Sequence, residues 1–228
     1  NFGCPVPKVT RKGGGGAPGL FDEAPDLGGT RNATNLVYDT IFTWEALDLW
    51  LARLQAAELV AIDTETTSLD EMRAEIVGIS FSVQPGEAAY IPLTHRYPDA
   101  PEQLNREDVL AKLKPWLEDA DKKKLGQHIK YDRHVFANHG IEVRGYAHDT
   151  MLQSYVLEVH MPHGLASLAE RHAGRSGINY EDLCGKGAGQ IGFDQVDIAK
   201  AAEYSCEDSD QTLDVHRVLW PQIQANDK

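Results

Sequence analysis

Residues 59–65 read LVAIDTE, and this stretch decides the fold. Four apolar residues in a row predict a buried strand. Strand residues two apart point to the same face, so Asp63 and Glu65 place two carboxylates side by side at the strand's end. Burying like charges is costly unless a cation neutralises them, and hard oxygen ligands suit Mg²⁺ or Mn²⁺. Taken alone, the triplet also fits a solvated turn with two surface acids.

The segments around this strand predict an α/β fold in which helices flank a mixed β-sheet. Residues 76–83 and 88–93 form two more apolar strands, joined by a turn at residues 85–86. Short strands are expected near Leu125 and Tyr146. Apolar spacing predicts helices over about residues 43–54, 106–117, 131–138, 151–157 and 196–219. Three consecutive strands followed by alternating helices and strands indicate helices on both faces of the sheet.

The chain divides into two parts by composition. Residues 1–35 are rich in Gly and Pro with few apolar residues, which predicts a flexible linker. Residues 36–228 carry the periodic segments, which predicts one folded domain. The first residue is Asn rather than Met, which suggests a fragment of a longer protein.

Charge and cysteine content bound the partners and the location. The net charge of −13 and pI near 5.1 argue against nucleic-acid binding, because phosphate recognition usually needs a basic surface. Three unpaired cysteines favour a reducing compartment, so we expect a cytoplasmic protein. Apolar runs are too short to cross a bilayer, so no membrane partner is expected. A monomer is the default expectation.

Three further acids stand in informative places. Tyr204 and Asp208 are four residues apart on the final predicted helix, so they share one face, where a phenol can position water beside a metal-bound carboxylate. A packing tyrosine and a surface acid are the alternative. Asp132 falls in the first turn of a helix, where the helix dipole alone favours an acid. Asp149 is interpreted as a helix cap, and Cys206 as a packing residue.

Together these segments resemble the DEDD exonuclease superfamily, tyrosine subtype, and more closely the proofreading exonuclease domains of bacterial DNA polymerase I. The resemblance runs from about residue 36 to the end. It rests on residues 63–66 with 68–70, 89–92, 130–133, 149–152, 167–170 and 185–187. It implies a ribonuclease H-like fold. The histidine subtype is set aside, because it needs His five residues before the last acid and Glu203 stands there.

By this resemblance, four acids match the family's metal ligands, namely Asp63, Glu65, Asp132 and Asp208. Tyr204 matches the tyrosine that orients the attacking water. Five more positions match contacts to the terminal nucleotides of the nucleic acid: Thr66, Leu69, Gln127, His128 and Tyr180. His128 departs from the family, which usually has Asn there, so altered ligand contacts are expected without loss of activity.

The resemblance implies two divalent cations, Mg²⁺ or Mn²⁺, about 4 Å apart, which activate water and stabilise the leaving 3′ oxygen. The expected substrate is the 3′ end of single-stranded DNA, and the expected products are 5′-mononucleotides. A covalently linked polymerase domain is the expected partner and would supply much of the grip on DNA. Affinity of this chain alone should therefore be weak, helped locally by Lys130, Arg133 and Lys186. The alternatives are an exoribonuclease of the same superfamily and an inactive nucleic-acid-binding domain.

Overall fold

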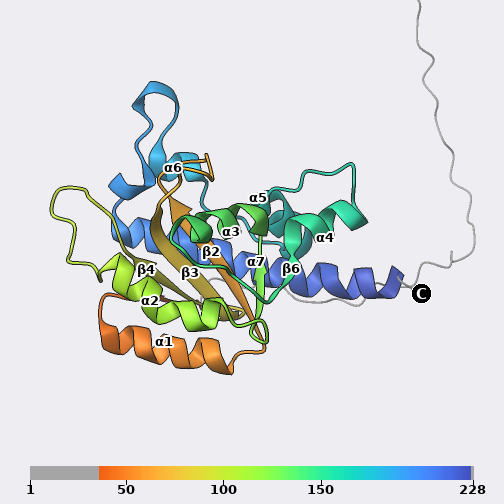
Figure 1. Cartoon of the computed structure of the whole chain (residues 1–228). Helices are drawn as coiled ribbons and strands as arrows, with labels where there is room; N and C mark the ends of the chain where they lie inside the picture. Colours follow the sequence, from red (N-terminus) through yellow and green to blue (C-terminus); the bar gives the residue numbers. More distant parts are fainter. Residues whose placement is uncertain (1–35, 227–228) are drawn as a thin grey trace, which may run out of the picture.

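Strand β2 (Leu59–Thr66), which carries the two acids, lies inside a sheet of six strands in the order β1-β4-β3-β2-β5-β6 (Figure 1). The computed structural model of the protein describes residues 36–226, so the predicted linker over residues 1–35 lies outside the described residues. The other strands are β1 (Val37–Thr40), β3 (Ile76–Gln84), β4 (Glu87–Pro92), β5 (Lys123–Gly126) and β6 (Tyr146–Asp149). Strand β2 runs antiparallel to β3 and parallel to β5, which confirms the predicted mixed sheet.

The helices cover both faces of the sheet. They are α1 (Trp44–Ala56), α2 (Arg106–Leu117), α3 (Ile129–Asn138), α4 (Thr150–Leu157), α5 (Leu165–Leu168), α6 (Tyr180–Cys184) and α7 (Ile198–Asn226). A π-helical turn follows α5 at Ala169–Ala173, and two 3₁₀ turns lie at Gly187–Gly189 and Phe193–Gln195. Figure 1 shows α7 crossing one face of the sheet while α1 and α2 lie on the other. In the described part of the chain, no helix has both the length and the apolar character needed to cross a bilayer.

The two largest apolar clusters of the described residues join these layers. The larger core joins α1, α2 and α3 to the sheet and contains an edge-to-face contact between Phe81 and Trp116, whose ring centroids are 5.8 Å apart. The second core lies under α7 and includes Tyr90 and Cys206. Cys206 is fully buried there, which confirms its predicted packing role.

Close packing under α7 depends on a missing side chain in β3. A Cβ atom on Gly78 would lie 2.0 Å from the hydroxyl oxygen of Tyr90, so any larger residue would displace that ring. Strand β3 also has a register shift opposite Glu65 and Thr66. This irregularity lies where β2 delivers its acids to the site.

The sequence predicted most elements, with three differences. Strand β1 was not predicted, because it has only four residues at the sheet edge, where it pairs with β4. Helix α3 begins at Ile129, two residues earlier than predicted, because the side chain of Asp149 accepts hydrogen bonds from its first backbone N–H groups. Helix α7 continues through Pro221 to Asn226, past its predicted end.

Candidate active site

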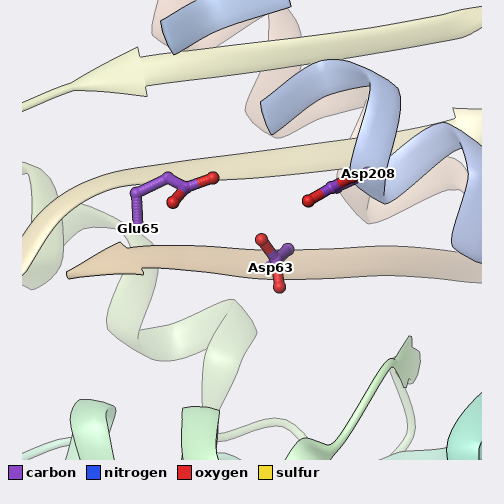
Figure 2. Close-up of side chains that lie close together, drawn as sticks. All are labelled: Asp63, Glu65 and Asp208. Carbon is purple, nitrogen blue, oxygen red and sulfur yellow. The ribbon is translucent and has the colours of Figure 1, made fainter. Parts of the chain in front are cut away.

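Strand β2 and helix α7 bring three carboxylates together. Asp63 and Glu65 point from the same face of β2 toward Asp208 on α7 (Figure 2). One oxygen from each carboxylate lies within 4.8 Å of the other two. Asp208 lies more than 140 residues after Asp63 and Glu65 in the sequence and belongs to a different element. Their all-oxygen donor set is the kind that Mg²⁺ and Mn²⁺ prefer.

The fourth predicted acid, Asp132, lies beside this group and not within it. It comes from the first turn of α3 and is 2% exposed. Its carboxylate accepts a hydrogen bond of 2.5 Å from the hydroxyl of Thr64, on the face of β2 opposite Asp63. Asp132 is not the residue that caps α3, because Asp149 receives the N–H groups at that terminus. Its side chain is therefore available to the cleft.

Burial and mutual repulsion make the ionised form of these acids costly. Burial raises the pKa of Asp63 to about 7. Burial, followed by the charges of Asp63 and Asp208, raises the pKa of Glu65 well above its usual value. Burial and then the charge of Asp63 likewise raise the pKa values of Asp132 and Asp208. A bound cation would reverse this balance, because it favours the ionised carboxylates.

Tyr204 lies one helical turn before Asp208 on the same face of α7. Burial, then the charges of Asp208 and Glu65, raises the pKa of its phenol far above the usual value. The phenol therefore keeps its proton at neutral pH. A hydrogen bond from Tyr204 in turn lowers the pKa of Asp208. Tyr204 and Asp208 thus meet as the sequence predicted, with the phenol as a donor.

All ten predicted site residues line one cleft of about 480 Å³. The three neighbouring acids, Asp132 and Tyr204 all contribute to its lining. The five positions expected to contact nucleotides stand around it: Thr66, Leu69, Gln127, His128 and Tyr180. Leu69 is 93% exposed where it lines the cleft, so its side chain is free to contact a ligand.

An aromatic wall closes one side of the cleft. The ring of Phe193 lies 6.2 Å from that of Tyr180 and 6.0 Å from that of Tyr204, measured between centroids. The sequence analysis identified Tyr180 and Tyr204 but missed Phe193, which stands in a 3₁₀ turn with no helical or strand periodicity. It also missed Tyr131, which lines the cleft next to Asp132.

Gln127 already uses much of its hydrogen-bonding capacity inside the protein. Its amide oxygen accepts from the Thr150 hydroxyl at 2.5 Å, and its amide nitrogen donates to the backbone carbonyl of His163 at 2.8 Å. One N–H of the amide remains for a ligand. The residue therefore fixes the loop around His163 to the cleft.

The position of His128 is explained by its backbone. Its φ of 65° and ψ of 49° place it in the left-handed region, which Asn and His adopt more readily than most residues. An Asn at this position would suit the same backbone conformation. The ring of His128 stacks on Tyr131 with 6.3 Å between centroids.

The basic residues expected to assist DNA binding lie elsewhere. Lys130 and Arg133 line a separate cleft of about 840 Å³ on the outer side of α3. Lys186 is paired with Glu181 at the surface. None of the three lines the acidic cleft, so they do not offset its charge directly.

The fold and this cleft define a class. The chain matches the 3′–5′ exonuclease family over residues 38–224 and belongs to that family. This confirms the resemblance drawn from the motifs.

Its relatives are longer proteins. The chain is 51% identical to DNA polymerase I of Pseudomonas aeruginosa over 90% of its own length and 23% of that polymerase. It is 40% identical to DNA polymerase I of Rhizobium leguminosarum, over 82% of the chain and 20% of the relative. The chain thus spans less than a quarter of these polymerases.

Solved structures support the ribonuclease H-like fold. A structure of Pol1 from M. smegmatis in complex with DNA primer-template and dNTP superposes with a TM-score of 0.62 at 18% identity, covering 82% of this chain and 28% of that one. Brucella melitensis NrnC with bound Mg²⁺ superposes with a TM-score of 0.55 at 20% identity, covering 82% of this chain and 80% of that one. At such identities the likeness concerns the fold.

Proposed function

We propose that this protein is a metal-dependent 3′→5′ exonuclease that removes 5′-mononucleotides from the 3′ end of single-stranded DNA, as the proofreading domain of a bacterial DNA polymerase. The observation that carries the proposal is the meeting of Asp63, Glu65 and Asp208 at one end of the cleft, with Tyr204 beside them. Membership in the 3′–5′ exonuclease family supports the direction of digestion.

Each residue in the cleft has a distinct task under this proposal. A pair of divalent cations, Mg²⁺ or Mn²⁺, would supply an activated water and charge stabilisation for the leaving 3′ oxygen. Asp63, Glu65 and Asp208 offer ionised oxygens to hold them, with Asp132 alongside. Tyr204 orients the attacking water through its phenol and does not act as a base, since the phenol remains protonated.

The rim of the cleft would hold the end of the strand. Leu69 stands exposed where it can wedge between the last bases, and Tyr180 presents a half-exposed ring for stacking. Such contacts recognise bases without reading their sequence, which suits an enzyme that removes any 3′ nucleotide.

The test is digestion of a single-stranded DNA oligonucleotide labelled at its 5′ end, with and without Mg²⁺. We expect a ladder of products shortened from the 3′ end, 5′-mononucleotide release, and no digestion in EDTA. The Asp208→Asn variant is the matched control, because it keeps the side-chain shape and removes the charge. A parent protein that leaves the oligonucleotide intact in Mg²⁺ and Mn²⁺ contradicts the proposal and favours the inactive binding domain.

A matched RNA oligonucleotide distinguishes the exoribonuclease alternative. The high identity to two DNA polymerases favours DNA. Faster digestion of RNA than of DNA under the same conditions would contradict the proposed DNA substrate and favour the exoribonuclease.

We further propose that the chain works in the cytoplasm, as a monomer, beside a polymerase domain of the same polypeptide. With a net charge of −13, the chain alone should bind single-stranded DNA weakly at physiological salt. Fluorescence anisotropy measures this, and nanomolar affinity would contradict it.

A further inference from the structure

Acidic and threonine side chains alternate along the end of β2 and face different helices. Asp63 and Glu65 face α7 and the cation site, as described above. Thr64 and Thr66 face α3 instead, and each hydroxyl contacts a side chain in its first turn. Thr64 meets Asp132 at 2.5 Å, and Thr66 meets the Tyr131 hydroxyl at 2.5 Å. The same four residues therefore supply acids to one side and fix the register of α3 on the other.

The contact between Thr64 and Asp132 is buried on both sides. Thr64 is 7% exposed and Asp132 is 2% exposed, so water cannot readily replace the hydroxyl. Asp132 also lies close enough to Asp63 to be repelled by its charge. Without the hydroxyl, only the backbone N–H groups of Thr64 and Asp132 would hold this carboxylate against the repulsion, so it would turn away from the acids more readily.

We propose that Thr64 is a positioning residue whose hydroxyl holds the carboxylate of Asp132 beside the three-acid group, so that a cation meets an oriented fourth acid. The inference rests on the proposed function, because it assumes that Asp132 contributes to cation binding. Groups that orient metal ligands typically contribute 10- to 100-fold to metal affinity, and we expect an effect of about tenfold here.

The test is Mn²⁺ binding to the full chain, measured by electron paramagnetic resonance and calorimetry for the parent, Thr64→Val and Thr64→Ser. Valine keeps the branched shape that suits a strand and removes the hydroxyl, whereas serine keeps the hydroxyl. We expect Thr64→Val to weaken the binding of one of the two proposed Mn²⁺ ions about tenfold and to leave the binding of the other unchanged. Thr64→Ser should bind both as the parent does. Thermal unfolding checks that both variants fold.

A double variant separates positioning from a general structural effect. If Thr64 acts through Asp132, then Thr64→Val combined with Asp132→Asn should bind Mn²⁺ no more weakly than Asp132→Asn alone. Additive losses would overturn the inference, as would parental binding by Thr64→Val. A parent protein that binds no Mn²⁺ at all would instead contradict the proposed function, so the two failures are distinguishable.

Discussion

Asp208 and Asp210 stand two residues apart on α7, yet their surroundings are opposite. Asp208 faces Asp63 and Glu65, and no lysine or arginine among the described residues lines the cleft around them. Asp210 is fully buried and accepts hydrogen bonds from Arg175, from the Tyr38 hydroxyl and from the backbone N–H of Gly86.

The charge of Asp210, on its side of α7, is thus neutralised by Arg175 of the protein itself. Arg175 also pairs with Asp214, one turn further along α7, at 2.9 Å. Its Nη2 atom donates to the Tyr38 hydroxyl at 3.1 Å, which ties strand β1 to the same network. The difference teaches that a buried acid alone does not mark a site. A buried acid whose neighbours are other acids does, because its balancing charge must come from outside.

The largest expected effect comes from removing the two acids of β2 that face Asp208. The Asp63→Ala, Glu65→Ala double variant should lose at least about 10⁴-fold in exonuclease rate, since several kcal/mol of charge stabilisation disappear and each 1.4 kcal/mol is tenfold. Digestion of the labelled DNA oligonucleotide measures the rate. The metal-free variant should also melt no lower than the parent, because repulsion is relieved. Digestion at the parental rate would show that the site is assigned wrongly.

Substitutions in the ion pair between Arg175 and Asp210 should lower the stability of the protein and not the rate of the reaction. Arg175→Met leaves the buried Asp210 without its cation, which typically costs 3 to 5 kcal/mol, whereas Asp210→Asn should cost less because Arg175 keeps its pair with Asp214. For Arg175→Met in a domain of this size we expect a fall in Tm of roughly 10 °C, measured by thermal unfolding. Below the melting temperature, Asp210→Asn should keep most of its exonuclease rate. A stable but inactive variant would contradict the division between the two sides of α7.

A third expectation concerns pH in the absence of metal. Burial raises the pKa of Asp63 to about 7 from its usual value of about 3.8, so the protonated form is favoured in the folded chain. Asp63 therefore stabilises the folded protein when it is protonated. This contribution to stability is fully present below the pKa of Asp63 in the unfolded chain, and it is lost as the pH rises through its pKa in the folded chain. Between pH 5.5 and 7.5 we expect a loss of about 1 to 2 kcal/mol attributable to Asp63.

The measurement compares the metal-free parent with Asp63→Asn by chemical unfolding at both pH values. The asparagine variant lacks the titrating group, so its stability should change less across this window. Adding Mg²⁺ should stabilise the parent more at pH 7.5 than at pH 5.5, because the ion competes with protons for the carboxylates. Equal pH dependence in both proteins would contradict the assigned cause.

Much of this arrangement followed from sequence, because periodicity fixes which side chains share a face. The pairing of Asp63 with Glu65 follows from the two-residue repeat of a strand, and that of Tyr204 with Asp208 from the helical turn. The meeting of the two pairs did not follow from either repeat. It required the resemblance to a known family.

What the sequence did not predict depends on contacts between distant segments. Nothing local shows that Asp210 has a balancing charge, since its partner Arg175 lies in an irregular loop before α6. Phe193 carries no periodic signal either, and it joins the cleft only because its 3₁₀ turn packs on α7. The position of Asp132 beside the three-acid group likewise involves a contact with a distant segment, the hydrogen bond from the hydroxyl of Thr64 on β2.

The smallest expected effect tests a serine hydroxyl of α7 that contacts one of the three neighbouring acids. Ser205 donates a hydrogen bond of 2.7 Å to Glu65, and both side chains are buried. Ser205→Ala should therefore destabilise the protein by about 1 kcal/mol. Ser209→Ala is the matched control, because its hydroxyl donates only to backbone carbonyls of its own helix. Chemical unfolding should show a larger loss for Ser205→Ala, and equal losses would mean that the hydroxyl does little to hold Glu65. In saturating Mg²⁺ the gap between the two variants should narrow, since the ion then takes over the task of orienting that carboxylate.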